Sequence, residues 1–173
     1  IRNRATLAGN LVTASLAPHW AIARMDMTDA AGIKELIARE KPACVVHCAA
    51  AGVANTNLPI EEARRANVVP LAPFCETLAT HSPHARIVLA SSFFVLDGGA
   101  NLDESAPTKP TTSYAKSKLE AEERLQTLAD RLGLEWITLR LFGVFGAYES
   151  PQRLLPYLVA KLMRGERAEL TAG

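Results

Sequence analysis

The sequence predicts an α/β protein that is built on a doubly wound parallel sheet. Short apolar segments rich in β-branched residues alternate along the 173 residues with longer segments of helical periodicity. Continuous apolar segments such as CVVHCAA are typical of strands that are covered on both faces, as they are in a parallel sheet. Strands that alternate with helices of this length indicate right-handed βαβ units, and such units build a doubly wound sheet.

Four strands and four helices are expected. The strands are expected at residues 20–25, 43–50, 85–92 and 135–142. The helices are expected at residues 29–40, 59–81, 111–133 and 151–166. Asp29 is a suitable N-cap for the first helix, and Gly133 is a suitable stop for the third. Pro70 and Pro73 should bend or break the second helix.

The composition is that of a globular protein, with 49% hydrophobic and 21% charged residues. Lys and Arg total 19 against 18 Asp and Glu, so no surplus of positive charge favours nucleic acid or an anionic membrane. No apolar segment approaches the ~20 residues that cross a bilayer, and the first ten residues lack the regions of a signal peptide. The three cysteines have no metal-ligand spacing, and we expect Cys44 and Cys48 to be buried and reduced. The sequence therefore predicts a cytoplasmic protein with no metal, membrane or nucleic-acid partner.

Tyr114 and Lys118 are the first candidates for catalysis. Four residues of helix advance by about 400°, so both side chains should project from one face, one turn apart. A free tyrosine titrates near ~10, and a nearby ammonium should lower the pKa of Tyr114 toward the neutral range. The alternative is a surface tyrosine that packs on the stem of a lysine.

Further candidates follow the expected strands. Ligands of doubly wound sheets bind at the carboxyl ends of the strands. Ser91 and Ser92 lie at such an end, where a hydroxyl could meet a substrate carbonyl beside the tyrosine, although two serines could also simply end the strand. The segment HCAAAG follows the strand before, and its small residues would let a flat ligand approach the backbone. Tight packing of helix on sheet would explain the same alanines.

Six motifs follow one another along the chain: D-x-x-D, V-V-H-C-A-A, A-N-V, S-S-x-x-V, Y-x-x-x-K and L-R-L-F-G-V-F-G. In this order and at these intervals they resemble the extended short-chain dehydrogenase/reductase family, which contains nucleotide-sugar epimerases, dehydratases and ketoreductases. The resemblance covers nearly the whole chain. It implies a Rossmann-type sheet, NAD or NADP as cofactor, a nucleotide-sugar substrate and a possible homodimer.

The resemblance also implies roles for single residues. Tyr114 would be the general acid/base, Ser92 would hydrogen-bond the same substrate oxygen, and Lys118 would hold the nicotinamide ribose and lower the tyrosine pKa. Asn67 matches an asparagine whose role would be structural. The remaining cofactor-binding residues would be Asp26 and Met27 at the adenine, Cys48, Ala49 and Ala50 along the adenosine and pyrophosphate, and Leu141 and Phe142 near the nicotinamide.

Phe93 and Phe94 discriminate among the reactions of this family. The resemblance places them at the two positions where the 4,6-dehydratases of the family carry an Asp-Glu pair. Phenylalanine cannot transfer protons. The segment SFFVLDGG resembles the 4-keto-sugar reductases, whereas LRLFGVFGAYESP resembles the broader epimerase/dehydratase branch. Reduction of a 4-keto sugar by hydride transfer is therefore the first hypothesis. A nucleotide-sugar 4-epimerase and a non-catalytic, NADP-binding regulatory subunit are the alternatives.

The glycine-rich turn G-x-x-G-x-x-G of the family does not occur in these 173 residues. The resemblance would place it, and the first strand of the sheet, before Ile1. We therefore expect residues 1–173 to form a single, partial dinucleotide-binding domain from which most of the carboxy-terminal substrate-binding region is absent. The isolated segment is expected neither to bind a dinucleotide tightly nor to turn over substrate.

Overall fold

The computed structural model describes residues 26–52, 58–99, 102–146 and 149–170. The strand expected at residues 20–25 lies outside the described residues. The chain divides into two compact units, the first ending at Leu141 and the second beginning at Phe142. Each unit is described by itself, and the expectation of one partial domain stays a prediction.

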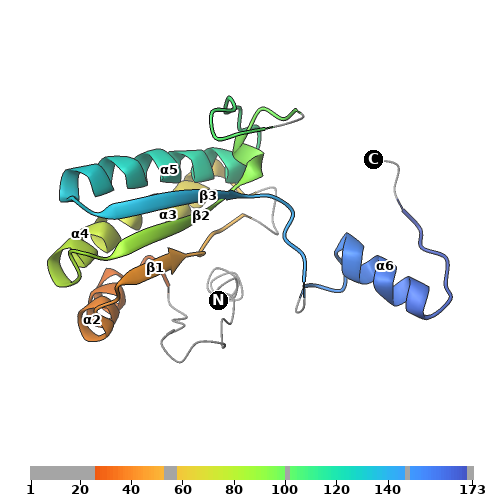
Figure 1. Cartoon of the computed structure of the whole chain (residues 1–173), viewed down its shortest axis with the longest axis horizontal. Helices are drawn as coiled ribbons and strands as arrows, with labels where there is room; N and C mark the ends of the chain where they lie inside the picture. The colour runs from red at the N-terminus through yellow and green to blue at the C-terminus, as the bar shows by residue number, and fades with distance from the viewer. Residues whose placement is uncertain (1–25, 53–57, 100–101, 147–148, 171–173) are drawn as a thin grey trace. The chain divides into compact units, whose positions relative to one another are not determined.

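The first unit contains a parallel sheet of three strands in the order β1-β2-β3 (Figure 1). The strands are β1 (Cys44–His47), β2 (Arg86–Ser92) and β3 (Glu135–Leu141). Cys44 pairs with Arg86, which in turn pairs with Glu135. All three strands fall inside the expected segments, and the α/β class with a parallel sheet is confirmed. The expected strand 43–50 is shorter than predicted, because the chain leaves the sheet after His47.

Local signals in the sequence explain where the helices begin and end. They are α2 (Ala30–Glu40), α3 (Ile60–Asn67), α4 (Leu71–His81) and α5 (Ser113–Leu132), with a single 3-10 turn at Phe93–Val95. The Asp29 carboxylate accepts a hydrogen bond from the Gly32 N–H at 3.0 Å, as an N-cap should. Gly133 ends α5 at a φ of 68°, in the left-handed region that glycine adopts without strain. The break predicted near Pro70 is confirmed, because α3 and α4 are separate helices on either side of Val68–Pro70.

The core lies between the sheet and one layer of helices. Figure 1 shows α5 running alongside β2 and β3. Ile87 and Leu89 of β2 are fully buried, as are Leu125 and Leu128 of α5. Two further groups of the same core come from α2 and α4: Ile33 and Ile37, and Leu71, Phe74, Cys75 and Leu78.

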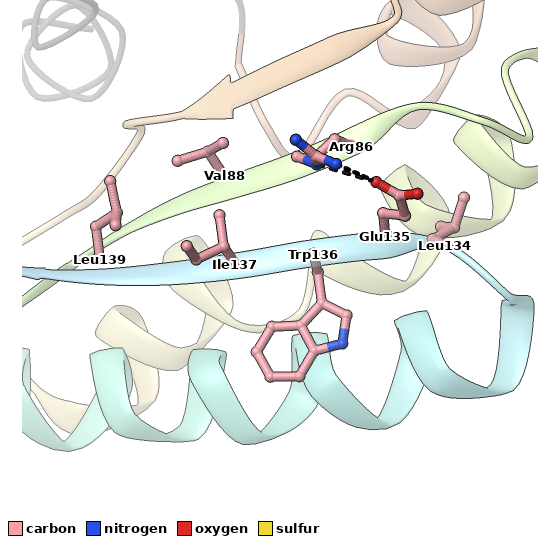
Figure 2. A pocket seen from close by; sticks show the side chains of 7 residues that line it. All are labelled: Arg86, Val88, Leu134, Glu135, Trp136, Ile137 and Leu139. Carbon is pink, nitrogen blue, oxygen red and sulfur yellow. Dashed lines mark hydrogen bonds and ion pairs between the residues drawn. The ribbon is translucent and has the colours of Figure 1, made fainter. Parts of the chain in front are cut away.

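The other face of the sheet is open in the described part of this unit. Ile137 and Leu139 are 46% and 41% exposed, and Figure 2 shows them with Val88 on the face away from α5, whereas Trp136 points toward the helix. An ion pair of 2.6 Å joins Arg86 to Glu135 at the edge of this shallow depression. The expectation that the strands are covered on both faces is therefore wrong for the described residues. For the same reason Cys44, which we expected to be buried, is exposed.

The second unit contains one described helix, α6 (Leu154–Met163). None of its residues is buried, and Leu162 and Met163 are among the most exposed apolar side chains. The Tyr157 hydroxyl accepts a hydrogen bond from the Glu169 N–H at 3.1 Å, and Lys161 pairs with Glu166 at 2.8 Å. In the described ranges, no helix is long and apolar enough to cross a membrane.

Candidate active site

Tyr114 and Lys118 occupy the first two turns of α5. The helix begins after Thr112, whose hydroxyl accepts a hydrogen bond from the Ala115 N–H at 3.1 Å. Lys118 is only 2% exposed, and Tyr114 is half-buried. Lys116, which lies between them, is exposed to solvent, so Lys118 is the lysine of the candidate pair. The alternative of a surface tyrosine on a lysine stem does not describe this arrangement, since Lys118 is in the interior.

Both side chains lie at the carboxyl end of β2. The Lys118 ammonium donates a hydrogen bond to the Ala90 carbonyl oxygen at 2.5 Å. A hydrogen bond links the Tyr114 phenol to Ser92, which ends the strand and is buried. The structure therefore brings Ser92, Tyr114 and Lys118 together at the strand end where ligands of parallel sheets bind.

Burial raises the pKa of Tyr114, and the hydrogen bond from Ser92 offsets this only in part. The sequence led us to expect the opposite direction, with Lys118 lowering the tyrosine pKa. That expectation is wrong for this structure, because the Lys118 ammonium is directed to the Ala90 carbonyl and desolvation dominates at the phenol. Tyr114 is therefore protonated at neutral pH.

Burial also lowers the pKa of Lys118, to about 8, while Cys48 and Glu122 act in the opposite direction. The burial of Cys48 raises the pKa of its thiol, and the nearby Lys118 ammonium lowers it. Lys118 thus remains mostly charged at neutral pH, despite its removal from water.

Glu122 and Arg140 extend the site beneath the serines, and the sequence reasoning missed both. The Ser91 hydroxyl donates to the Glu122 carboxylate. Arg140 of β3 donates to the same carboxylate from Nη2 at 2.9 Å and from Nε at 3.2 Å. Glu122 is buried, one helical turn beyond Lys118. The spacing of Tyr114, Lys118 and Glu122 at i, i+4 and i+8 was the signal that could have revealed it.

The loop after β1 is held against α5 by Asn67. Its side-chain oxygen accepts from the Ala51 N–H at 2.7 Å, and its amide nitrogen donates to the Ala51 carbonyl at 3.1 Å and to Ser117 Oγ at 2.9 Å. Gly52 follows at a φ of +93°, and a Cβ there would lie 3.4 Å from the Cβ of Tyr114. This loop therefore passes close to the tyrosine, and Asn67 fixes its backbone.

His47 lies at the end of β1, on the side of the sheet that faces the helices. It is buried, its ring meets that of Phe74 edge-on at 5.6 Å, and its Nδ1 has no hydrogen-bond partner in the described structure. Burial, and secondly the Lys118 ammonium, lower its pKa from 6.5 to about 4. His47 is therefore neutral at physiological pH.

The residues predicted to bind a dinucleotide are distributed over several segments of the described chain. Ala49 and Ala50 are buried just after β1, and Cys48 is half-buried beside them. The Asp26 carboxylate accepts from the Thr28 N–H and hydroxyl at 3.0 and 2.7 Å. Three other predicted residues are Met27, which packs partly against the core, Leu141, which is 41% exposed at the end of β3, and Phe142, which is exposed and belongs to the second unit.

These residues fit part of a dinucleotide. The buried ammonium of Lys118 carries three donors, of which one goes to the Ala90 carbonyl, and such a group suits ribose hydroxyls. Ala49 and Ala50 allow a close approach to backbone, while no glycine-rich turn for the pyrophosphate occurs in the 173 residues. In the described ranges, no group of three or more His, Cys, Asp or Glu side chains could hold a metal ion.

Phe93 and Phe94 follow Ser92 directly. Their rings stack with centroids 4.2 Å apart at 30°, and Phe94 is 54% exposed. The Ser92 Oγ caps their turn by accepting from the Phe94 N–H at 3.3 Å. An aromatic pair therefore stands beside the Ser92 hydroxyl, and neither ring can transfer a proton.

Comparisons with known proteins give a family match over nearly the whole chain. Residues 2–173 match the model of the NAD dependent epimerase/dehydratase family. The chain is similar to the dTDP-6-deoxy-L-talose 4-dehydrogenase (NAD(P)(+)) of Kitasatospora kifunensis, with 31% identity over 150 residues, 83% of this chain and 46% of the relative. It is 25% identical over 164 residues to the human dTDP-D-glucose 4,6-dehydratase, which covers 91% of this chain and 46% of the relative. The chain thus spans about half the length of the curated relatives that it matches.

Solved structures show the same fold. The UDP-glucose 4-epimerase of Thermotoga maritima, solved with UDP-glucose, matches with a TM-score of 0.75 and 18% identity, over 93% of this chain and 54% of that one. The dTDP-glucose 4,6-dehydratase of Bacillus anthracis, solved with NAD, matches with a TM-score of 0.68 and 20% identity, over 86% and 46%. At these identities the likeness shows the fold alone, and it confirms the predicted Rossmann-type class.

Proposed function

Because this chain belongs to the NAD dependent epimerase/dehydratase family, we propose that the protein carrying it is an NAD(P)-dependent oxidoreductase that reduces a keto group of a nucleotide-linked sugar. One observation carries the proposal. Ser92, Tyr114 and Lys118 converge at the end of β2, and the two positions after Ser92 hold phenylalanines. Hydride transfer to a ketone requires a proton donor at its oxygen, and this site offers one.

The proposed roles follow from the position and protonation of each group. When bound, the nicotinamide supplies the hydride to the carbonyl carbon. Tyr114, kept protonated by burial, donates its phenolic proton to the carbonyl oxygen as that oxygen gains charge. Ser92 Oγ lies beside the phenol and hydrogen-bonds the same oxygen. Lys118, whose ammonium has donors beyond the one given to the Ala90 carbonyl, would hold the ribose hydroxyls.

The proposed cofactor contacts elsewhere rest on position. Ala49 and Ala50 would lie along the adenosine and pyrophosphate, with Cys48 beside them, because they follow β1 at its carboxyl end. Asp26 and Met27 would lie at the adenine. Leu141 and Phe142 would lie near the nicotinamide end.

Elimination of water, as in the 4,6-dehydratases, is disfavoured by the chemistry beside Ser92. Such a reaction needs an acid and a base in addition to the tyrosine, and Phe93 and Phe94 supply neither. The relative that is named a 4-dehydrogenase favours simple hydride chemistry at C4. A 4-epimerase is the second candidate, since it would use the same three side chains.

The decisive experiment compares Tyr114→Phe with the unchanged complete gene product. A dTDP-linked 4-keto-6-deoxyhexose is supplied with NADH or NADPH, and consumption of the reduced cofactor is followed by its absorbance. We expect steady consumption by the unchanged protein and a fall of about 10²- to 10⁴-fold in Tyr114→Phe, the usual contribution of a general acid. Binding of the cofactor, followed by its fluorescence, should be unchanged in the variant.

A matched pair of lysine variants controls this result. Lys118→Gln should lose turnover and weaken cofactor binding, whereas Lys116→Gln, an exposed lysine of the same helix, should change neither. Interconversion of UDP-hexoses without net consumption of cofactor would support the epimerase instead. Cofactor binding without turnover of either substrate, together with no effect of Tyr114→Phe in any assay, would favour a regulatory subunit and overturn the proposal.

A further inference from the structure

A ladder of three contacts joins α5 to the end of β2. Tyr114, Lys118 and Glu122 are spaced by four residues and therefore lie along one side of the helix. Their partners are the last three residues of the strand: Ser92 for Tyr114, the Ala90 carbonyl for Lys118 and the Ser91 hydroxyl for Glu122. The reaction proposed above involves the side chains of the first two contacts, and it assigns no role to the contact between Ser91 and Glu122.

The third contact is the best anchored of the three. Arg140 is the register partner of Ser91 on β3, and it reaches the Glu122 carboxylate from two nitrogens. The side chains of Glu122 and Arg140 are 10% and 27% exposed, so the charges are largely removed from water. A paired, hydrogen-bonded charge of this kind favours one geometry, because any other leaves a buried ion unpaired. Glu122 thereby ties α5 to two strands at once.

We propose that Glu122, held by Arg140 and Ser91, is the positioning residue that places Lys118 and Ser92 for reaction with Tyr114. The proposal rests on the proposed reduction. Ser91 lies between Ala90 and Ser92, so a displaced Ser91 moves the partners of both Lys118 and Tyr114. A shift of about 1 Å in such groups is enough to lower a rate by as much as about 100-fold.

The charge of Glu122 has a second consequence. Three titratable groups interact with the Lys118 ammonium: His47 at the end of β1, Cys48 just after it, and Glu122 from α5 itself. From β2, the Ala90 carbonyl accepts its hydrogen bond. The Glu122 carboxylate is a negative charge near Lys118, and it raises the pKa of Lys118 against the effect of burial. Removal of this charge lowers that pKa below about 8, and the lysine then loses its proton at a lower pH.

Two variants separate placement from charge, measured as turnover against pH in the complete gene product. Glu122→Gln keeps the size of the side chain and removes its charge. We expect kcat to fall by roughly 10- to 100-fold with little change in KM, and the alkaline limb of the pH profile to move to lower pH. Glu122→Asp keeps the charge and shortens the reach, so kcat should fall while the alkaline limb stays in place. Glu123→Gln, an exposed neighbour on α5, is the control and should behave as the unchanged protein.

Ser91→Ala removes only the hydroxyl that links the strand to Glu122, and it tests the same contact if Glu122→Gln does not fold. It should lower kcat in the same direction with the alkaline limb unmoved. A loss of thermal stability in Glu122→Asp and Ser91→Ala, with kcat and the pH profile unchanged, would show a purely structural role and overturn the inference. If the unchanged protein itself shows no reduction, the proposed function has failed instead, so the two failures are distinguishable.

Discussion

His47 predicts a loss of stability in mild acid whose size can be worked out from its environment. The unfolded chain takes up a proton on this ring as the pH falls below 6.5, whereas the folded protein does not do so until about pH 4. The unfolded state therefore binds more protons in this window, and acid favours it. For one such group, the free energy of unfolding falls by about 2 kcal/mol between about pH 7.5 and about pH 5. The full loss of about 3 kcal/mol is reached below about pH 4.

The perturbation that tests this is His47→Phe, which keeps an aromatic ring against Phe74 and removes the titrating group. Urea unfolding is measured at both pH values for each protein, and the difference between the two free energies is compared. We expect the variant to lose about 2 kcal/mol less than the unchanged protein on acidification, whatever its absolute stability. His84→Gln, which changes an exposed histidine, should lose as much as the unchanged protein. Equal losses in His47→Phe and the unchanged protein would refute the reasoning, because the acid sensitivity would then come from other groups.

Two further predictions concern the loop after β1. Asn67→Ala removes three hydrogen bonds and leaves both polar groups of the Ala51 backbone without this partner. The free energy of unfolding, measured in urea, should therefore fall by about 3 kcal/mol. A fall of less than about 1 kcal/mol would mean that water replaces the amide. Gly52→Ala and Gly133→Ala should each cost roughly 1–2 kcal/mol, because both positions have positive φ. Only Gly52→Ala should also lower kcat, since its new Cβ meets Tyr114 whereas nothing lies within 4 Å at Gly133. Equal kcat values for the two glycine variants would show that the loop does not position the tyrosine.

Local signals in the sequence were sufficient for most of the fold. Three of the four β-branched segments are parallel strands, and the fourth lies outside the described residues. Asp29, Pro70 and Gly133 act on the backbone of their own neighbours, so their effects could be predicted without a structure. The exposure of Cys44 could not, because it depends on which sheet face the helices cover.

The candidate site was predictable only in part, for a similar reason. Tyr114 and Lys118 share a helix face by spacing alone, but the direction of the tyrosine pKa depends on where the Lys118 ammonium points. The Ala90 carbonyl, 28 residues away in the sequence, decides that. Glu122 shares this helix face by the same spacing, but its pairing with Arg140 of β3 is a tertiary contact that spacing alone does not give.

The raised pKa of Tyr114 bears on the direction of the proposed reaction. Reduction of a ketone needs a protonated phenol, whereas oxidation of an alcohol needs a phenolate that can accept the proton. Burial keeps Tyr114 protonated, so the site without ligand is in the state that reduction requires. Lys118, whose charge Glu122 helps to retain at neutral pH against the effect of burial, would hold the ribose of the cofactor. Oxidation would have to begin from the phenolate, which burial of Tyr114 makes scarcer, so the protonated phenol is the state from which the proposed reduction would begin.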